Sequence, residues 1–267
     1  MIDIHTHILP GLDDGPGDMD TALEMARIAA ADGIKGIIAT PHVATGLYEH
    51  SLEDITSSVS QLKKALAQKK IPVDIYPGAE YLIEPELPSK LQARQLMTLN
   101  DTGKYLLVEM PFSSVPSFAG QVLYEIMLCG VKPVLAHPER NEEIQRKPHL
   151  LKSLWEKGVL VQVTSGSITG VFGERVQALS YSFLRRGYVH FVASDAHSPQ
   201  RRVPVLGQAV EMINRDATGD IAGFLTETNP RLLVEGKQVR KLPPIEVGEL
   251  ERKKILGRFF SKMKLHK

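Results

Sequence analysis

The chain has 267 residues, of which 43% are hydrophobic and 24% are charged, a composition typical of a globular protein with a substantial core. The formal net charge is +1, but residues 237–267 carry +7 and the preceding residues carry −6. An acidic body disfavours nucleic acid as the ligand, and the single cysteine, Cys129, excludes an internal disulfide. Because the sequence has neither a secretory signal nor an apolar stretch that could span a bilayer, we expect a cytoplasmic protein.

Apolar, strand-like runs alternate with helix-like segments along most of the chain. The predicted strands are residues 2–7, 36–40, 73–83, 105–109, 132–137, 159–164 and 189–195. The predicted helices are residues 18–31, 52–69, 116–128, 148–157, 174–186, 203–214 and 221–225. This alternation predicts a largely parallel sheet, and about seven strands favour an α/β barrel or a distorted relative of one. No segment resembles a linker, so we predict a single domain.

Two histidines stand two residues apart at the start of the chain. On a strand, His5 and His7 would point to one face, while Ile2 and Ile4 would point to the other. Two converging imidazoles can begin a metal site. A lone pair of this spacing is unspecific, so the prediction depends on the ends of the later strands.

Six predicted strands deliver a histidine or a carboxylate at or just beyond the carboxyl end, where α/β barrels build their active sites. These residues are His5 and His7, His42, Glu80, Glu109, His137, and Asp195 with His197 just beyond it. Imidazoles and carboxylates are costly to bury without partners. A cluster of divalent metal ions would satisfy all of them together, and such a mixed set suits manganese, iron or zinc better than calcium.

The motifs around these residues resemble those of one known group of proteins. They are His5-Thr6-His7, Leu12-Asp13-Asp14-Gly15-Pro16, Thr40-Pro41-His42, Gly78-Ala79-Glu80, Glu109-Met110-Pro111, Ala136-His137-Pro138-Glu139-Arg140 and Ser194-Asp195-Ala196-His197. In this order they resemble the PHP (polymerase and histidinol phosphatase) superfamily. Within it, the chain is most similar to the bacterial manganese-dependent protein-tyrosine phosphatases of capsular and exopolysaccharide operons. The resemblance implies a distorted, TIM-barrel-like (β/α)7 domain over residues 1–236, followed by a basic tail over residues 237–267.

The resemblance also implies three divalent metal ions, with manganese as the expected metal. The first ion would be held by His5, His7, Glu80 and Asp195; Glu80 would bridge to a second, held with Glu109 and His137; Asp14, His42 and His197 would hold the third. The four carboxylates leave an excess charge of about +2 on such a cluster, which favours an anionic substrate.

The same resemblance assigns the catalytic parts. A water acidified between two metals would be the nucleophile. Arg140 and Arg202 would bind the phosphate as guanidinium forks, and only the family spacing favours Arg202 over Arg201. Asp14 would act as a metal ligand, as a proton donor to the leaving oxygen, or as both.

We therefore expect a metal-dependent protein-tyrosine phosphatase, with a bacterial tyrosine kinase of capsule or exopolysaccharide synthesis as its partner. One alternative is a small-molecule phosphatase of the same superfamily, such as a histidinol-phosphate phosphatase. Another is a non-catalytic, metal-bound regulatory module. Cysteine-based phosphatase chemistry is disfavoured, because Leu135 stands six residues after Cys129 where that mechanism needs an arginine.

Several polar residues near the motifs have structural interpretations. Asp13 is predicted to form a turn with Gly15, and His190 to be a core histidine. Glu139 is predicted to be a solvated loop charge, with a supporting partner of the metal ligands as the alternative. The segment 164–167 either contacts the substrate or caps a loop.

The basic tail has apolar residues spaced as on one face of a helix, from Leu250 to Met263. An amphipathic helix of this kind would contact an anionic membrane surface or a partner protein. Packing against the barrel, or a frayed terminus, is the alternative.

Overall fold

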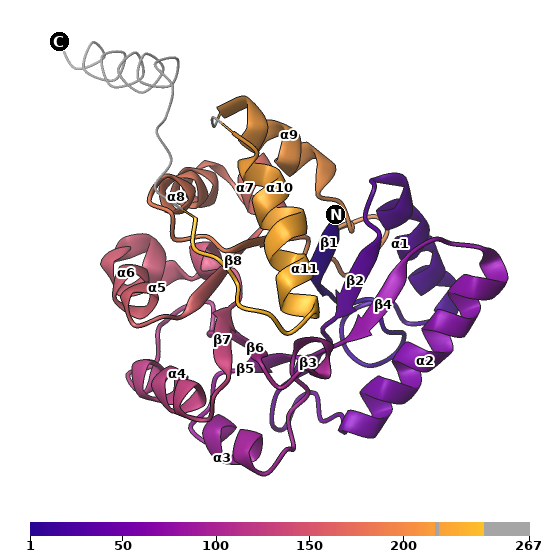
Figure 1. The fold of residues 1–267 in the computed structure, drawn as a ribbon, viewed down its shortest axis with the longest axis horizontal. Helices are drawn as coiled ribbons and strands as arrows, with labels where there is room; N and C mark the ends of the chain where they lie inside the picture. The colour runs from indigo at the N-terminus through magenta and orange to yellow at the C-terminus, as the bar shows by residue number, and fades with distance from the viewer. Residues whose placement is uncertain (217–218, 243–267) are drawn as a thin grey trace.

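The computed structural model describes residues 1–216 and 219–242. Within them, a curled parallel sheet is surrounded by helices (Figure 1). The strands are β1 (Ile2–Thr6), β2 (Gly36–Ala39), β3 (His42–Val43), β4 (Asp74–Pro77), β5 (Glu80–Leu82), β6 (Tyr105–Glu109), β7 (Lys132–Leu135), β8 (Leu160–Thr164) and β9 (Phe191–Ala193). The strand order is β1-β2-β4 in one sheet and β3-β5-β6-β7-β8-β9 in the other, with every pair parallel. A bridge from Thr6 to Ala196 brings β1 beside the chain that leaves β9, so the two sheets curl into a barrel-like body and confirm the predicted fold class.

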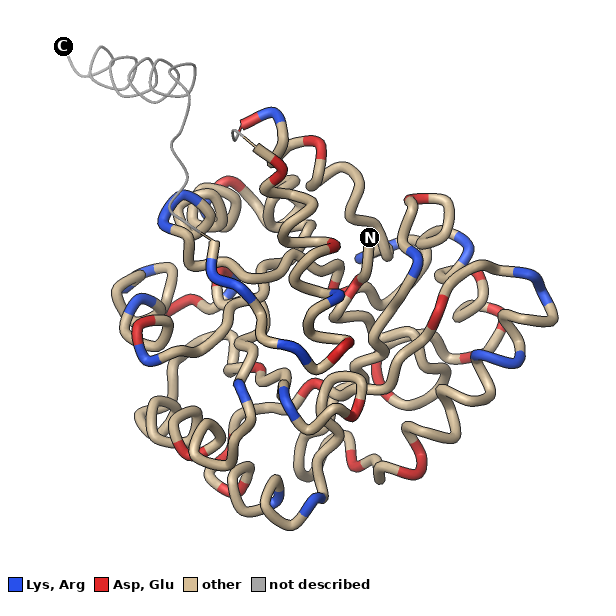
Figure 2. The backbone as a smooth tube through the Cα atoms, viewed as in Figure 1, with Lys and Arg blue, Asp and Glu red and all other residues tan. Residues whose placement is uncertain are grey.

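Most of the helices cover the outside of the strands, whereas α11 (Asn229–Val234) lies across the middle of the ring of strands (Figure 1). They are α1 (Met19–Ala31), α2 (Leu52–Lys69), α3 (Leu87–Gln92), α4 (Ala119–Leu128), α5 (Glu142–Arg146), α6 (His149–Glu156), α7 (Ser165–Thr169), α8 (Glu174–Arg185), α9 (Gly207–Asp216), α10 (Ile221–Gly223) and α11 (Asn229–Val234). Short helical turns are η1 (Leu99–Asp101), η2 (Pro138–Arg140) and η3 (Phe224–Thr228). In the described residues, no helix is long and apolar enough to cross a membrane. Figure 2 shows positive and negative residues interspersed along the outer helices and loops.

The two longest helices begin at side-chain caps that the sequence encodes. Asp18 accepts a hydrogen bond from the Thr21 backbone N–H at the start of α1. At the start of α2, Ser51 and Asp54 form a reciprocal capping box. α2 ends where Lys70 adopts a left-handed conformation, with φ of 55°. These local signals explain why the predicted bounds of α2 match the observed ones.

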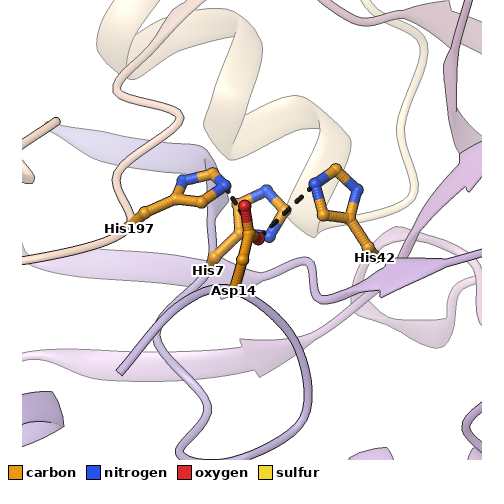
Figure 3. A group of neighbouring side chains, drawn as sticks. All are labelled: His7, Asp14, His42 and His197. Carbon is orange, nitrogen blue, oxygen red and sulfur yellow. Dashed lines mark ion pairs between the residues drawn. The ribbon is translucent and has the colours of Figure 1, made fainter. Parts of the chain in front are cut away.

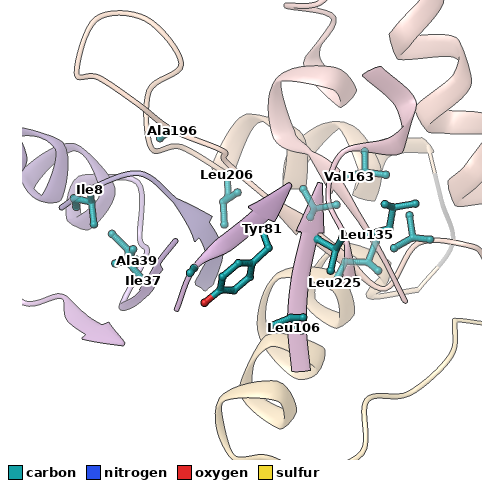
Figure 4. Packing of buried hydrophobic residues seen from close by; sticks show 14 of the residues in the cluster. Ile8, Ile37, Ala39, Tyr81, Leu106, Leu135, Val163, Ala196, Leu206 and Leu225 are labelled. Atoms are coloured by element: carbon teal, nitrogen blue, oxygen red, sulfur yellow. The ribbon is translucent and has the colours of Figure 1, made fainter. Parts of the chain in front are cut away.

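The buried apolar side chains form two layers. Ile37 and Leu106 belong to the larger, outer cluster between strands and helices, part of which Figure 4 shows. Their neighbours Ile38 and Leu107 point the other way, into a smaller cluster inside the barrel. This alternation follows from the two-residue repeat of a strand. It also explains why these strands are apolar on both faces.

The last described segment closes the barrel at the amino ends of the strands. The Tyr105 hydroxyl donates to the Lys237 carbonyl oxygen at 2.6 Å and accepts from the Val239 N–H at 3.0 Å. Val239 and Leu242 are buried. The chain beyond the predicted boundary at Gly236 therefore packs on the body as far as residue 242, and the predicted amphipathic helix lies outside the described residues.

One predicted strand is wrong. Residues 73–83 form two strands, β4 and β5, which belong to different sheets. The break lies at Gly78, where an added Cβ would come within 2.7 Å of Ile38 Cγ2 and 3.1 Å of the Ala39 carbonyl oxygen. Only glycine allows this close approach, and the chain crosses there from one sheet to the other. The short elements β3, α3, α5, α7 and α11 were not predicted.

Candidate metal centre

The nine residues predicted as metal ligands lie together at the carboxyl-end face of the sheet. They come from β1 and the chain after it (His5, His7, Asp14), from β3 (His42), β5 (Glu80) and β6 (Glu109), and from the chain after β7 (His137) and β9 (Asp195, His197). Within each of four overlapping groups, the potential ligand atoms all lie within 4.8 Å of one another. These groups are His7, Asp14, His42 and His197; His5, His7 and Glu80; His5, His137 and Asp195; and His42, Glu80 and Glu109.

The first of these groups contains all three residues predicted to hold a third ion. Figure 3 shows the side chains of Asp14, His42 and His197 gathered around His7. Asp14 Oδ1 lies 3.2 Å from His197 Nε2 and 3.7 Å from His42 Nε2. Glu80 lies beside both residues predicted to share the second ion with it: Glu109 is in its group, and His137 Nε2 is 3.1 Å from Glu80 Oε1. His137 also forms a group with His5 and Asp195. Which residue serves which ion stays a prediction.

The centre has a buried floor and an open rim. His5, His7 and Glu80 are 0% exposed, whereas the side chains of His42 and Asp14 are 22% and 49% exposed. Access from solvent is therefore on the side of Asp14 and His42. Bulk water does not reach the floor.

Two floor histidines are oriented by hydrogen bonds at their outer nitrogens. His5 Nδ1 donates to Gln162 Oε1 at 3.0 Å, and His7 Nδ1 donates to Asp13 Oδ2 at 2.6 Å. Both Nε2 atoms then face Glu80, at 3.2 Å and 3.3 Å from its Oε2. Metal-ligating histidines typically use one nitrogen in this way and present the other to the ion. Asp13 also accepts from the Gly15 N–H, so its predicted turn role is confirmed, but its contact with His7 was missed.

The electrostatics of the floor indicate a missing positive charge. Burial lowers the pKa of His7, but its contacts with the Asp13 and Glu80 carboxylates outweigh this effect and raise the pKa to about 10. Among the described residues, Glu80 Oε2 and Asp195 Oδ1 are buried and lie 3.1–3.8 Å from ring nitrogens of the surrounding histidines, without a well-directed hydrogen bond. Such atoms are costly in a protein interior. A mixed set of imidazoles and carboxylates with these orphaned atoms fits divalent cations.

The two predicted phosphate-binding arginines converge on one carboxylate. Arg140 Nη1 lies 2.5 Å from Asp195 Oδ2, and Arg202 Nη2 also pairs with that oxygen. The other oxygen, Oδ1, faces His5 Nε2 at 3.4 Å. Despite burial, the nearby histidines and Arg202 hold the pKa of Asp195 well below its usual range. Arg201 is exposed, so the structure distinguishes the two neighbouring arginines.

Three residues of the centre have strained backbone conformations. The φ angles of His137, Asp195 and Arg202 are 29°, 52° and 45°, in the region that non-glycine residues rarely adopt. Strain of this kind persists only where surrounding contacts enforce it, and it gathers at functional sites. At Asp195 one enforcing contact is the fully buried Asp3, whose Oδ1 accepts from the Ser194 N–H at 3.0 Å.

The prediction that Glu139 is solvated is wrong. Glu139 is 0% exposed, and its Oε1 accepts from the Thr164 N–H at 2.9 Å and from the Ser167 hydroxyl at 2.7 Å. Glu139 thus joins the turn after His137 to the start of α7. This contact gives the segment 164–167 a structural role, whereas its contact with substrate stays a prediction. Burial raises the pKa of Glu139.

Other assignments depend on burial. His190 is a core histidine, as predicted: it is buried, and its Nδ1 accepts from the Val161 N–H at 3.1 Å. Gln162 was not predicted as a residue that orients a ligand. The one signal in the sequence is a polar residue within the apolar run of β8, which does not by itself reveal this role.

Comparison with known proteins agrees with this geometry. Residues 1–235 match the family described as capsular polysaccharide synthesis, CpsB/CapC. The chain is 43% identical over 259 residues to the tyrosine-protein phosphatase YwqE of Bacillus subtilis, covering 97% of this chain and 100% of that protein. It is 29% identical to the tyrosine-protein phosphatase CpsB of Streptococcus pneumoniae, covering 88% of this chain and 98% of that protein.

The fold is also similar to a solved structure. A structure from a study of YwqE from Bacillus subtilis and CpsB from Streptococcus pneumoniae, described there as unique metal-dependent tyrosine phosphatases, matches with a TM-score of 0.87 and 42% identity. The match covers 93% of this chain and 100% of that one. The chain therefore belongs to the CpsB/CapC family of capsular polysaccharide synthesis.

Proposed function

We propose that this protein is a metal-dependent tyrosine-protein phosphatase, a hydrolase of phosphotyrosine in proteins. The observation that carries this proposal is the buried cluster of histidines and carboxylates, in which Glu80 Oε2 faces three ring nitrogens without a well-directed hydrogen bond. The names of the relatives that match nearly the whole chain support the same reaction.

The cluster suits three divalent ions, with manganese as the proposed metal. The ligands would be His5, His7, Asp14, His42, Glu80, Glu109, His137, Asp195 and His197. Bound ions would supply positive charge to the phosphoryl oxygens and would acidify a water molecule for attack on phosphorus. The matching of ligands to single ions follows the resemblance described above.

The residues of this chain have separate roles around the ions. Gln162 and Asp13 would hold His5 and His7 in the tautomer that presents Nε2 to a metal. Arg140 and Arg202 would bind the phosphoryl oxygens, because Asp195 uses only part of each guanidinium fork.

Asp14 is the ligand at the open rim. Its side chain is half exposed and lies beside His197, so its carboxyl group can reach both a metal at the rim and the oxygen of a leaving group. The proposed role is therefore ligand, proton donor to the leaving tyrosine oxygen, or both.

The proposed partner is a tyrosine-phosphorylated protein, specifically a bacterial tyrosine kinase of capsule or exopolysaccharide synthesis. The family description, which refers to capsular polysaccharide synthesis, supports this assignment. The open side of the centre at Asp14 and His42 is compatible with a phosphate presented on a protein surface.

A direct test is phosphate release by the full chain after removal of metal with a chelator. The stripped protein should be inactive, and manganese should restore release from a phosphotyrosine peptide in preference to histidinol phosphate. Iron and zinc, added in parallel, would identify the best metal. A preference for histidinol phosphate would contradict the tyrosine-phosphatase proposal, and undiminished activity without metal would contradict the metal centre.

A further inference from the structure

Arg140 lies between two phenyl rings contributed by separate segments. Its Cζ atom is 4.8 Å from the centre of the Phe112 ring and 4.4 Å from the centre of the Phe172 ring. Both distances are within the range of cation–π attraction. Phe112 follows β6, Arg140 ends η2, and Phe172 lies between α7 and α8. Three stretches that are distant in sequence thus meet in one stack beside the metal centre.

The two rings are not explained by core packing. In the part of the chain that the structure describes, neither Phe112 nor Phe172 is among the apolar side chains that form or flank the two hydrophobic clusters. Their ring contacts are instead with Arg140 and, for Phe112, with His137, whose ring is nearly parallel at 13° and 5.7 Å away. The rings therefore belong to the site.

The position of Phe172 is built by its glycine neighbours. Gly170 and Gly173 on either side have φ angles of 88° and 93°, which glycine adopts without strain. An added Cβ on Gly166 would come within 2.9 Å of the Phe172 ring. The Val171 N–H donates to the Gly166 carbonyl oxygen at 2.9 Å and closes the turn. The local backbone thus presents this ring to the guanidinium.

Phe112 differs from Phe172 in its exposure. It is 47% exposed, so part of the ring stays free for contact while the rest lies against Arg140 and His137. A free phenyl surface beside a phosphate-binding guanidinium matches a ligand that carries an aromatic ring next to its phosphoryl group.

We propose that Phe112, Arg140 and Phe172 form one recognition unit for aryl phosphates. Phe172 is a positioning residue that fixes the guanidinium plane of Arg140, and Phe112 is a specificity-determining residue whose exposed ring contacts the aromatic ring of the substrate. This inference rests on the proposed phosphatase function and deepens it, because it assigns the preference for tyrosine over alkyl esters to named side chains.

The test compares two ligands that share a phosphonate and differ in the aryl group. Phenylphosphonate and methylphosphonate are titrated by calorimetry into the manganese-loaded full chain, so that no leaving-group chemistry affects the result. The wild-type protein should bind phenylphosphonate more tightly. Phe112→Leu should lower the ratio of the affinities for phenylphosphonate and methylphosphonate about tenfold. Phe112→Tyr, which keeps the ring, should retain the wild-type ratio.

The positioning role of Phe172 has a different signature. Phe172→Leu should weaken binding of both phosphonates equally, by about threefold, because the guanidinium is less well held. Phe172→Tyr should restore binding. Tyr124→Leu, which changes an exposed ring on α4 away from the centre, serves as the matched control and should alter neither affinity.

The outcomes separate the inference from the function. If Phe112→Leu keeps the full preference for phenylphosphonate, or if Phe172→Leu binds both ligands as the wild type does, the recognition unit is overturned while phosphotyrosine hydrolysis by the wild type still stands. If the wild-type protein neither binds a phosphonate nor hydrolyses a phosphotyrosine peptide, the proposed function fails, and this inference fails with it.

Discussion

The barrel buries two layers whose chemistry is opposite. Inside the barrel, Leu107 and Phe191 belong to an apolar cluster in which each side chain is satisfied by contact with its neighbours. In the metal centre, His5 and Glu80 are buried just as completely, but their polar atoms crowd one another, and Glu80 Oε2 has no well-directed hydrogen bond. The apolar layer therefore stabilises the fold by itself, whereas the polar layer depends on cations.

The largest expected effect is in the polar layer. Glu80→Gln should lower kcat/KM for a phosphotyrosine peptide on the order of a thousandfold, because it removes a floor charge that faces four histidines. Its bound metal, measured by elemental analysis, should fall in parallel. Glu84→Gln, four residues away and outside the cluster, is the control and should retain both. Full turnover by Glu80→Gln would show that the polar layer is not the active centre.

The next effect belongs to the outer apolar cluster, between strands and helices. Leu106→Ala should lower the free energy of unfolding by about 3 kcal/mol, because it leaves a cavity among fully buried side chains. Leu128→Ala, at a side chain that is 68% exposed, should change it by less than about 0.5 kcal/mol. Urea unfolding measures both. The loss should be equal with and without manganese; a loss seen only in the metal-loaded protein would contradict the independence of the apolar core.

A substitution at the border of the polar layer should separate phosphate binding from metal binding. Arg140→Ala should reduce kcat/KM roughly a hundredfold because it removes a charged donor to the phosphoryl group, while metal content stays near that of the wild type. Arg201→Ala, at an exposed neighbour of Arg202, should be nearly silent. Steady-state kinetics measures kcat/KM, and elemental analysis measures the metal content. An unchanged kcat/KM for Arg140→Ala would show that Arg140 is not part of the site.

His190 is a buried histidine that lies outside the cluster of histidines and carboxylates. Burial and nearby Lys241 lower its pKa to about 4, so the folded protein binds this proton less readily than the unfolded chain, whose histidine pKa is about 6.5. Its contribution to stability is present above pH 6.5 and declines as the pH falls towards 4. Between pH 7 and pH 5 this amounts to about 2 kcal/mol.

His190→Gln should remove that dependence, since glutamine can accept from the Val161 N–H but does not titrate in this range. Urea unfolding of metal-free wild type and variant at both pH values gives the difference. Equal losses of stability in the two proteins would show that His190 titrates normally.

The smallest effect concerns orientation within the polar layer. Gln162→Leu should weaken manganese binding about tenfold, because His5 loses the acceptor that fixes its tautomer. Gln121→Leu, on the exposed side of α4, is the matched control. A manganese titration that gives the same affinity for Gln162→Leu and wild type would show that His5 needs no such support.

The two layers also differ in how far the sequence predicts them. The bounds of β6 and α2 were predicted as observed, because the continuous apolar run of β6 and the capping box of α2 are local signals. The split between β4 and β5 was not predicted, since the reason for Gly78 lies in its close approach to Ile38 and is visible only in three dimensions.

In the polar layer, the strand ends pointed to eight of the nine clustered residues and the family resemblance added Asp14, but neither pointed to the residues that hold them. Glu139 was taken for a solvated charge because its partners, Thr164 and Ser167, lie about 25 residues further along the chain. Gln162 was missed for the same reason, since it lies 157 residues from His5. Asp13 lies only 6 residues from His7, and its turn role was predicted without this contact. Residues that supply ligands follow strand ends, whereas residues that orient them come from whichever element packs behind.

The measurement that tests the central claim most directly is the number of metal ions held by the polar layer. The full chain, equilibrated with manganese and then freed of unbound ions, should retain about three ions per chain by elemental analysis. A chain that retains no metal, yet hydrolyses phosphotyrosine, would contradict the account.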